Sequence, residues 1–193
     1  MPVLHLLAGP NGAGKSSYVR DVLAPATHLP FINADEIAAS RWPDAQVEHA
    51  YKAAQIAETL RRDRIAAGES FISETVFSHP SKVQLVADAA DAGYLVHLYV
   101  IMVPVELTVQ RVHERVRRGG HAVPERKTRD RYQRLWEHIG SAIRIADVTE
   151  VFDNSRARTP FQLCATYQHG TLIGTPSWPK WAPVELSAST TWP

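Results

Sequence analysis

Cysteine is nearly absent from this chain, and its scarcity limits how the fold can be stabilised. Cys164 is the single cysteine among 193 residues, so no disulfide can form within the chain. A chain of this length can bury a sufficient core without one. We therefore expect a fold suited to a reducing, cytoplasmic setting. Cys164 lies in an apolar run and is expected to be a core residue.

Long hydrophobic runs and a strong net charge are also missing. No stretch approaches the ~18 consecutive apolar residues of a membrane span. The apolar N-terminus lacks a basic leader and runs directly into a glycine-rich loop, so we expect a first strand and not a signal peptide. The net charge of +1 argues against a dedicated nucleic-acid binder. The composition is that of an ordinary globular protein.

A P-loop motif, Gly-x4-Gly-Lys-Ser, lies between the first apolar run and a helical pattern. Its glycines allow backbone N–H groups to surround a phosphate at the N-terminus of a helix. Lys15 is expected to reach the β- and γ-phosphates of ATP, and Ser16 to supply a hydroxyl ligand to Mg²⁺. The predicted nucleotide-binding residues here are Pro10, Asn11, Gly12, Ala13, Gly14, Lys15, Ser16 and Ser17. The alternative is a glycine-rich turn with an exposed lysine.

Carboxylates follow the next two predicted strands. Asp35 comes after Pro30–Asn33, and Glu74 and Thr75 come after Ser70–Ser73. The carboxyl ends of parallel strands face the ligand crevice, so we expect all three side chains at the acceptor. Asp35 can accept the hydroxyl proton, or it can cap the helix that it precedes. Glu74 can hold a substrate hydroxyl or a water on Mg²⁺, or it can be a solvated strand end.

Arginine is concentrated between Arg111 and Arg134, where eight arginines and one lysine accompany three acidic residues. Arg111, Arg115 and Arg118 recur at helical spacing on one face, and two glycines follow as a hinge. Guanidinium groups match phosphate oxygens better than ammonium groups do. The segment therefore predicts an arginine-rich lid over the phosphates, with a solvated helix face as the alternative.

Two further groups complete the predicted site. Arg129, Arg131 and Arg134 form a second positive face on the next helix, and Arg131 is predicted to be catalytic with Arg115. Asn154 follows the fifth predicted strand, where a loop can border the adenine.

Strand and helix patterns alternate along the chain, which predicts parallel β-α-β units. We expect an α/β fold of the P-loop kinase type, with three layers, a mostly parallel five-stranded sheet, an arginine-rich helical lid and a C-terminal hairpin. The predicted strands are Val3–Leu7, Pro30–Asn33, Ser70–Ser73, Leu95–Val103 and Val148–Phe152, and the hairpin joins Phe161–Tyr167 to Thr171–Gly174.

The first helix is predicted to run from Lys15 to Leu23 and to stop before Pro25. Residues 1–174 are expected to form a single kinase domain. Residues 175–193 hold four prolines and three tryptophans, and we expect a surface tail without regular structure.

Together these motifs resemble the zeta toxin family of P-loop kinases, in order and at consistent spacing. The segments that carry the resemblance are Ala8–Ser16, Phe31–Ile37, Phe71–Ser78, and Gly119–Pro124 with Arg131-Tyr132. The resemblance is to a stand-alone branch whose members often lack an antitoxin, so an antitoxin protein stays an open alternative as a partner.

The resemblance implies an activity and a set of roles. Family members phosphorylate the amino sugar of UDP-N-acetylglucosamine with ATP and Mg²⁺. Asp35 would then be the base, Glu74 would contact the acceptor, and Arg111 or Arg115 would contact the phosphates. The residues before the lid proline read Gly120-His121-Ala122-Val123, without the second phosphate-binding arginine of characterised toxins. Arg118, Arg129 or Arg131 would have to replace that arginine, or His121, a predicted substrate-binding residue, takes part instead.

Other functions fit parts of the same pattern. A polynucleotide or RNA kinase, or a kinase of another small metabolite, would use the same P-loop and basic lid. A nucleotide-binding module without catalysis would use the P-loop alone.

Overall fold

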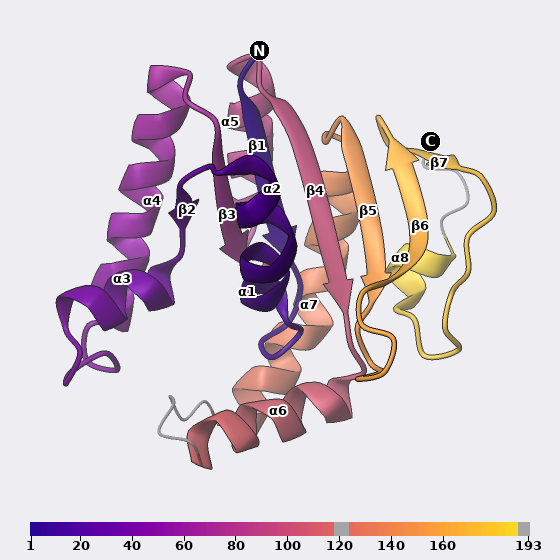
Figure 1. Ribbon diagram of the computed structural model, residues 1–193. Coiled ribbons are helices and arrows are strands. Elements are labelled where there is room, and N and C mark those ends of the chain that lie inside the picture. The colour runs from indigo at the N-terminus through magenta and orange to yellow at the C-terminus, as the bar shows by residue number, and fades with distance from the viewer. Residues whose placement is uncertain (118–123, 189–193) are drawn as a thin grey trace.

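A seven-stranded sheet forms the centre of the computed structural model, which describes residues 1–117 and 124–188 (Figure 1). The strand order is β2-β3-β1-β4-β5-β6-β7, and β1 to β5 run parallel. The strands are β1 (Val3–Ala8), β2 (Phe31–Ile32), β3 (Phe71–Thr75), β4 (Leu95–Met102), β5 (Val148–Asp153), β6 (Gln162–Gln168) and β7 (Thr171–Ile173).

The predicted C-terminal hairpin is part of this sheet, so the expectation of five strands was too low. Strand β6 pairs antiparallel with β5, and β7 pairs with β6. An edge strand exposes unpaired N–H and C=O groups. The hairpin therefore covers the edge that β5 would otherwise expose.

Helices cover the two faces of the sheet (Figure 1). They are α1 (Lys15–Tyr18), the π-helical segment η1 (Val19–Leu23), α2 (Ala24–Thr27), α3 (Ala34–Arg41), α4 (Ala50–Ala67), α5 (Ser81–Asp91), α6 (Val105–Arg117), α7 (Glu125–Ile143) and α8 (Val184–Ser187). Helices α5 and α7 lie behind the central strands, and α1 to α2 lie in front.

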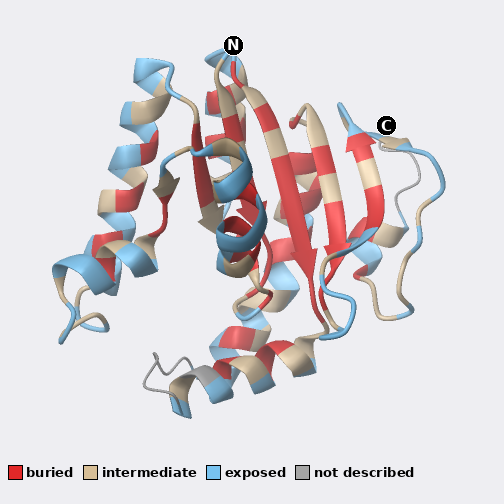
Figure 2. Cartoon of the chain, viewed as in Figure 1, coloured by how far each residue is buried: buried red, intermediate tan, exposed pale blue. Residues whose placement is uncertain are grey.

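Strand β1 shows why the central strands read as continuous apolar runs. Leu4 and Leu6 belong to the core under α5 and α7, whereas Leu7 belongs to the core under α1 and η1. Successive side chains of a strand point to opposite faces, so a strand covered on both sides needs apolar residues at nearly every position. The central strands are accordingly buried along most of their length (Figure 2).

The first helix does not stop before Pro25, as predicted, but continues to Thr27. Proline has no N–H to donate and its ring crowds the preceding turn. Here the wider π-helical segment Val19–Leu23 precedes the proline, and Pro25 lies in the first turn of α2, where a missing N–H is tolerated.

The segment that follows Thr175 also differs from the prediction. It contains α8, and Leu186 of this helix is 1% exposed. Tyr167 donates a hydrogen bond of 3.4 Å to the Leu186 carbonyl, and Trp178 and Trp181 pack against the main core. Burial of these side chains stabilises a short helix that has no strong propensity of its own.

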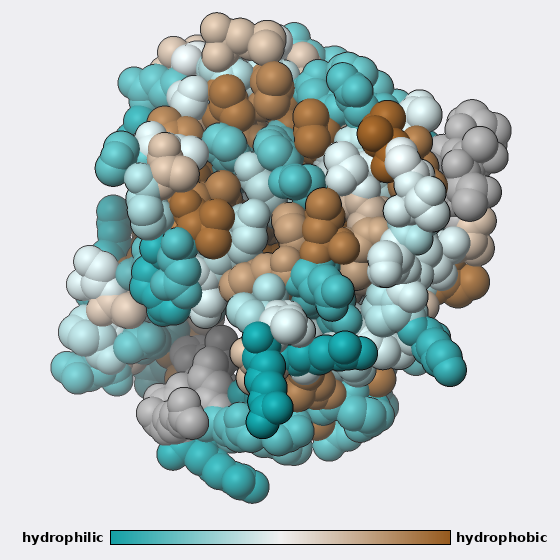
Figure 3. Space-filling view, turned by 45° about the vertical axis from the view of Figure 1, so that its right-hand side comes forward, coloured by the Kyte–Doolittle hydropathy of each residue, from teal (hydrophilic) through white to brown (hydrophobic). Residues whose placement is uncertain are grey.

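Two surface findings complete the fold. Within residues 1–117 and 124–188, no helix has both the length and the apolar character of a membrane span. On the face seen in Figure 3, hydrophobic side chains occur in separate groups divided by hydrophilic ones.

A polar network lies on the sheet face that carries α1. Tyr99 Oη lies 3.0 Å from His5 Nδ1 and 3.0 Å from His97 Nδ1, and His97 Nε2 lies 3.0 Å from Glu150 Oε2. Burial, with the neighbouring His97 as the second cause, lowers the pKa of His5 from 6.5 to about 4. His5 is therefore neutral in the folded protein at pH values where the unfolded chain would take up a proton.

We expect the free energy of unfolding to fall as the pH decreases from about 6.5 to about 4, because the unfolded state binds a proton that folded His5 resists. The loss should be about 1–2 kcal/mol, since partial exposure of the imidazole screens the effect. Urea unfolding of the wild type and of His5→Gln at pH 7 and pH 4.5 measures it. His113→Gln, at an exposed position of α6, is the control. An equally steep loss in His5→Gln would contradict the assignment.

Candidate active site

A cavity of ≈ 940 Å³ lies at the carboxyl ends of β2 and β3, beside the P-loop that follows β1. The chain passes from β1 outward to β2, returns to β3 and then crosses to β4 on the other side of β1. Such a reversal of strand order leaves a crevice, which is where ligands bind in open α/β sheets. The fold therefore places the predicted strand-end residues and the P-loop around one space.

The P-loop begins with a glycine that no other residue can replace without a shift. Gly9 has φ +146°, and a Cβ at this position would lie 2.3 Å from the Ile101 carbonyl oxygen of β4. Lys15 is 7% exposed, and its Nζ donates to the carbonyl oxygens of Gly9 (3.0 Å) and Pro10 (3.1 Å). Its ammonium group is thereby held against the loop, and Lys15 lines the cavity.

Ser16 and Glu74 meet across the crevice. Ser16 Oγ donates a 2.9 Å hydrogen bond to Glu74 Oε2, which brings together a P-loop hydroxyl and a carboxylate at the end of β3. Mg²⁺ binds oxygen ligands, and in sites of this class it is held by one or two protein groups together with phosphates and water. The donor set fits this ion. Among the described residues, no cluster of three or more His, Cys, Asp or Glu could hold a metal alone.

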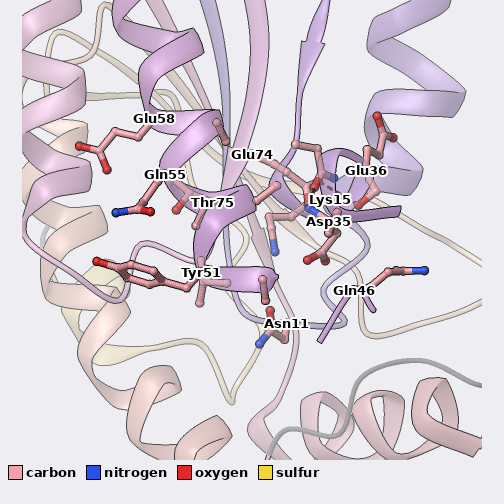
Figure 4. A pocket seen from close by; sticks show the side chains of 18 of the residues that line it. Asn11, Lys15, Asp35, Glu36, Gln46, Tyr51, Gln55, Glu58, Glu74 and Thr75 are labelled. Atoms are coloured by element: carbon pink, nitrogen blue, oxygen red, sulfur yellow. Dashed lines mark hydrogen bonds between the residues drawn. The ribbon is translucent and has the colours of Figure 1, made fainter. Parts of the chain in front are cut away.

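Asp35 lines the cavity from the first turn of α3. The helix cap is Asn33, whose Oδ1 accepts a 2.7 Å hydrogen bond from the Asp35 N–H, so the capping role considered for Asp35 is wrong. In Figure 4 the Asp35 and Lys15 side chains lie at the same side of the cavity, near Glu36. Desolvation in the cleft, followed by the Glu74 charge, raises the pKa of Glu36.

Two predicted nucleotide-binding residues contact the backbone of the P-loop instead of lining the cavity. Arg111 donates 3.0 Å hydrogen bonds to the carbonyl oxygens of Gly12 and Asn154. Asn154 donates a 2.8 Å hydrogen bond to the Ala13 carbonyl, and a Cβ on Gly14 would lie 2.5 Å from the Asn154 amide nitrogen. Arg111 of α6 and Asn154, which directly follows β5, therefore both brace the loop.

Of the predicted arginines on helix α7, Arg131 lines the cavity and Arg129 does not. Arg131 lines the cavity together with Lys127, one helical turn earlier. Arg129 points elsewhere: it donates to both Glu106 oxygens (2.7 and 2.8 Å) and to Glu125 (2.8 Å). Of the candidates for the missing lid arginine, Arg131 is the one that reaches the site among the described residues.

The remaining predicted residues divide into three groups. Asn11 and Thr75 line the cavity, and Thr75 Oγ1 also accepts from the Phe77 N–H at 3.4 Å. Ser17 is half-buried on α1 and does not line the cavity. The side chain of Arg115, and Arg118 and His121 entirely, lie outside the described residues.

Sequence reasoning missed the wall that α4 and α5 contribute. Tyr51, Gln55 and Glu58 of α4 line the cavity, and in Figure 4 their side chains extend from the side of this helix that faces away from Lys15 and Asp35. Arg61 and Lys82 also line it. A signal was present for Arg61, because Ala50, Ala54, Ala57 and Arg61 recur at helical spacing on one face of α4 and all line the cavity.

We expect Arg111→Met to lower the free energy of unfolding by about 1–3 kcal/mol without nucleotide, because the carbonyls of Gly12 and Asn154 lose their charged donor. ATP should also bind more weakly. Urea unfolding of the nucleotide-free protein and calorimetric titration with ATP measure these changes. The control is Arg117→Met, at an exposed position of the same helix. Unchanged stability with lost ATP binding would instead support the direct phosphate contact predicted from the sequence.

Three comparisons with known proteins now bear on this site. A family model described as Zeta toxin matches residues 1–160. No curated protein matches the chain.

Solved structures establish the same fold. A structure of the PezAT chromosomal toxin-antitoxin system of the human pathogen Streptococcus pneumoniae matches with a TM-score of 0.62 and 17% identity, over 83% of this chain and 71% of that one. Shikimate kinase from Acinetobacter baumannii, in complex with shikimate, matches with a TM-score of 0.54 and 17% identity, over 81% of this chain and 86% of that one. A gluconokinase from Sinorhizobium meliloti matches with a TM-score of 0.53 and 19% identity, over 80% of this chain and 83% of that one.

The predicted P-loop kinase fold is thus confirmed, and so is the resemblance noted in the sequence. The family match covers the P-loop, both strand-end carboxylates and α7. This chain therefore belongs to the zeta toxin family, and it is an ATP-dependent phosphotransferase with an alcohol group as acceptor.

Proposed function

We propose that this kinase transfers the γ-phosphate of ATP to a sugar hydroxyl of UDP-N-acetylglucosamine or a related UDP-sugar. The observation that carries the proposal is the meeting of the P-loop with two strand-end carboxylates: Lys15, Ser16, Asp35 and Glu74 line one cavity. The family supplies the UDP-sugar as the acceptor to test first.

The proposed transfer assigns each of these residues a task. Asp35 accepts the proton of the acceptor hydroxyl and orients that oxygen toward the γ-phosphorus. The oxygen forms the new bond to phosphorus while the bond to the β–γ bridging oxygen breaks, and ADP leaves with the electron pair. Lys15 stabilises the negative charge on the β- and γ-phosphates during this step.

Mg²⁺ is the second part of the proposal. When bound, it would neutralise charge on the phosphate oxygens. Ser16 and Glu74 would hold it, Ser16 directly and Glu74 through a water, because their oxygens already lie 2.9 Å apart. Burial, followed by the Glu74 charge, raises the pKa of Glu36, so a second carboxyl group lies near the place where a divalent ion would bind.

Cations on α7 support a phosphate-bearing acceptor or a closing role over ATP. Lys127 and Arg131 face the cavity from one side of the helix. We assign Arg131 to the charge of the transferring phosphoryl group, with Arg115, Arg118 and His121 as further predicted contacts. An antitoxin partner and a cytoplasmic location belong to the same proposal and follow from the family and from the need for ATP.

Asp35→Asn should lower the rate of phosphate transfer by about 10²–10⁴-fold, because the amide cannot accept a proton. ATP binding should persist. The assay incubates the protein with ATP, Mg²⁺ and a metabolite panel that includes UDP-sugars, and detects phosphorylated products by mass spectrometry. Asp63→Asn, at an exposed position of α4, is the control. Wild-type turnover by Asp35→Asn would refute the base, and products lacking any UDP-sugar would refute the acceptor.

Ser16→Ala and Glu74→Gln should raise the Mg²⁺ concentration needed for half-maximal transfer by about tenfold, since each removes an oxygen ligand or its charge. Rates measured across a Mg²⁺ series at saturating ATP provide the test. Ser17→Ala is the matched control, because Ser17 does not line the cavity. The same Mg²⁺ requirement in all three variants would exclude this pair as the metal site.

A further inference from the structure

Arg61 of α4 is an arginine that the proposed transfer does not use. Its side chain is 5% exposed, although arginine is almost never fully buried without a charged partner. Its Nη1 makes one long hydrogen bond, 3.4 Å to Ser73 Oγ, and its Nε is buried without a partner among the described residues. A buried guanidinium left in this condition costs stability, so its presence requires a reason.

Ser73 cannot supply the missing interaction. Its hydroxyl proton is already directed to the Ile32 carbonyl oxygen at 3.1 Å. It is a neutral group and cannot balance the charge of Arg61.

The carboxylate whose charge acts on Arg61 is also engaged elsewhere. Glu58, one turn earlier on α4, attracts Arg61 but accepts a hydrogen bond from Arg62. Arg61 forms no ion pair with any acidic group of the described residues. Burial is the largest cause that lowers the pKa of Arg61, and the Glu58 charge only partly opposes it.

Lys82 at the start of α5 adds a second cation to the same place. Burial lowers its pKa, and the Arg61 charge lowers it further. Two cations that repel each other line one wall of the cavity. Such a pair is stabilised when an anion binds between them.

The position of Arg61 and Lys82 in the cavity indicates whether ATP or the acceptor would supply the anion. Along β3, Glu74 points to the P-loop side, where it meets Ser16, whereas Ser73 and Thr75 point to the opposite side. Arg61 contacts Ser73 and so lies on the Thr75 side, away from the residues that bind the triphosphate. Alanines at positions 50, 54 and 57 of α4 keep the space in front of it open.

We propose that Arg61 and Lys82 bind an oxyanion of the acceptor, a carboxylate or a phosphate, at this wall of the cavity. The inference rests on the proposed kinase reaction and narrows its acceptors to those that carry a negative charge as well as a hydroxyl. Arg61 offers the planar donor geometry that matches two oxygens, and Lys82 adds a compact charge.

Calorimetric titration of the full chain, with the P-loop filled by Mg²⁺ and a non-hydrolysable ATP analogue, tests the proposal. The probes form two pairs that differ mainly in charge: gluconate with sorbitol, and N-acetylglucosamine 1-phosphate with N-acetylglucosamine. The first pair tests a carboxylate and the second a phosphate. In at least one pair, we expect the charged member to bind about tenfold or more tightly than its neutral partner.

Arg61→Gln and Lys82→Gln should each reduce that charge preference about tenfold, and Arg61→Lys should retain part of it. Arg64→Gln is the control, because Arg64 lies on the same helix and pairs with Glu69 outside the cavity. Thermal unfolding identifies a variant that does not fold, and the half-buried Lys82 provides a second variant if Arg61→Gln fails. Absence of any charge preference, or its persistence in both glutamine variants, would overturn the proposal.

Asp35→Asn separates this inference from the proposed transfer. It should keep the charge preference and lose phosphate transfer. If a probe binds in a way that depends on Arg61 but the wild type transfers no phosphate to it, the oxyanion site is supported and that probe is refuted as an acceptor of the kinase. Phosphate transfer to an acceptor whose binding does not depend on Arg61 would support the kinase reaction and refute the oxyanion site.

Discussion

The backbone of the P-loop is fixed by its neighbours before any ligand arrives, and the rest of the site depends on that constraint. Gly9 passes so close to β4 that a side chain would meet the Ile101 carbonyl at 2.3 Å. Arg111 and Asn154 hold the carbonyls of Gly12 and Ala13 from α6 and β5. A loop whose carbonyls are turned outward to these donors can direct its N–H groups inward, which is the requirement for a phosphate site. Strands far apart in sequence thus determine one local shape.

Strand β3 divides the cavity chemically. Its alternating side chains place Glu74 beside Ser16 and place Thr75 with Arg61, so one strand separates a carboxylate-rich side from a cationic side. Hydrogen bonds also link β3 to the end of β2 and to the helix that carries Asp35. Ser73 bonds to the Ile32 carbonyl, and Asn33, the next residue, caps the helix that carries Asp35. These bonds fix the start of the helix that carries the proposed base.

Much of this site could be predicted because its signals are local. The P-loop, Asp35 and Glu74 each follow a strand pattern directly, and parallel strands bring their carboxyl ends to one edge. Arg61 escaped notice because its importance comes from burial against Ser73, which only tertiary packing creates. The contacts of Arg111 with two backbone carbonyls escaped notice for the same reason. Helical spacing placed it on the lid face, but spacing does not say whether a guanidinium meets a phosphate or a carbonyl.

Errors in the fold have equally specific causes. A proline was taken to end the first helix, but the π-helical segment Val19–Leu23 allows the chain to continue to Thr27. The tail was expected to lack regular structure, yet burial of Leu186 and two tryptophans stabilises α8. The first error comes from backbone geometry, and in the second packing outweighed a weak local preference.

The charges around the cavity explain why a small neutral sugar would be a poor match. Among the residues that the structure describes, five cations line it, namely Lys15, Arg61, Lys82, Lys127 and Arg131, alongside the carboxylates Asp35, Glu36, Glu58 and Glu74. The triphosphate would balance the charge of Lys15, and Mg²⁺ would balance the charges of Glu36 and Glu74. Arg61 lies on the Thr75 side, and it forms no ion pair with an acidic group of the residues that the structure describes. The cost of burying that guanidinium is recovered only if the acceptor brings its own negative charge, so the same residue that weakens the empty site would give it selectivity.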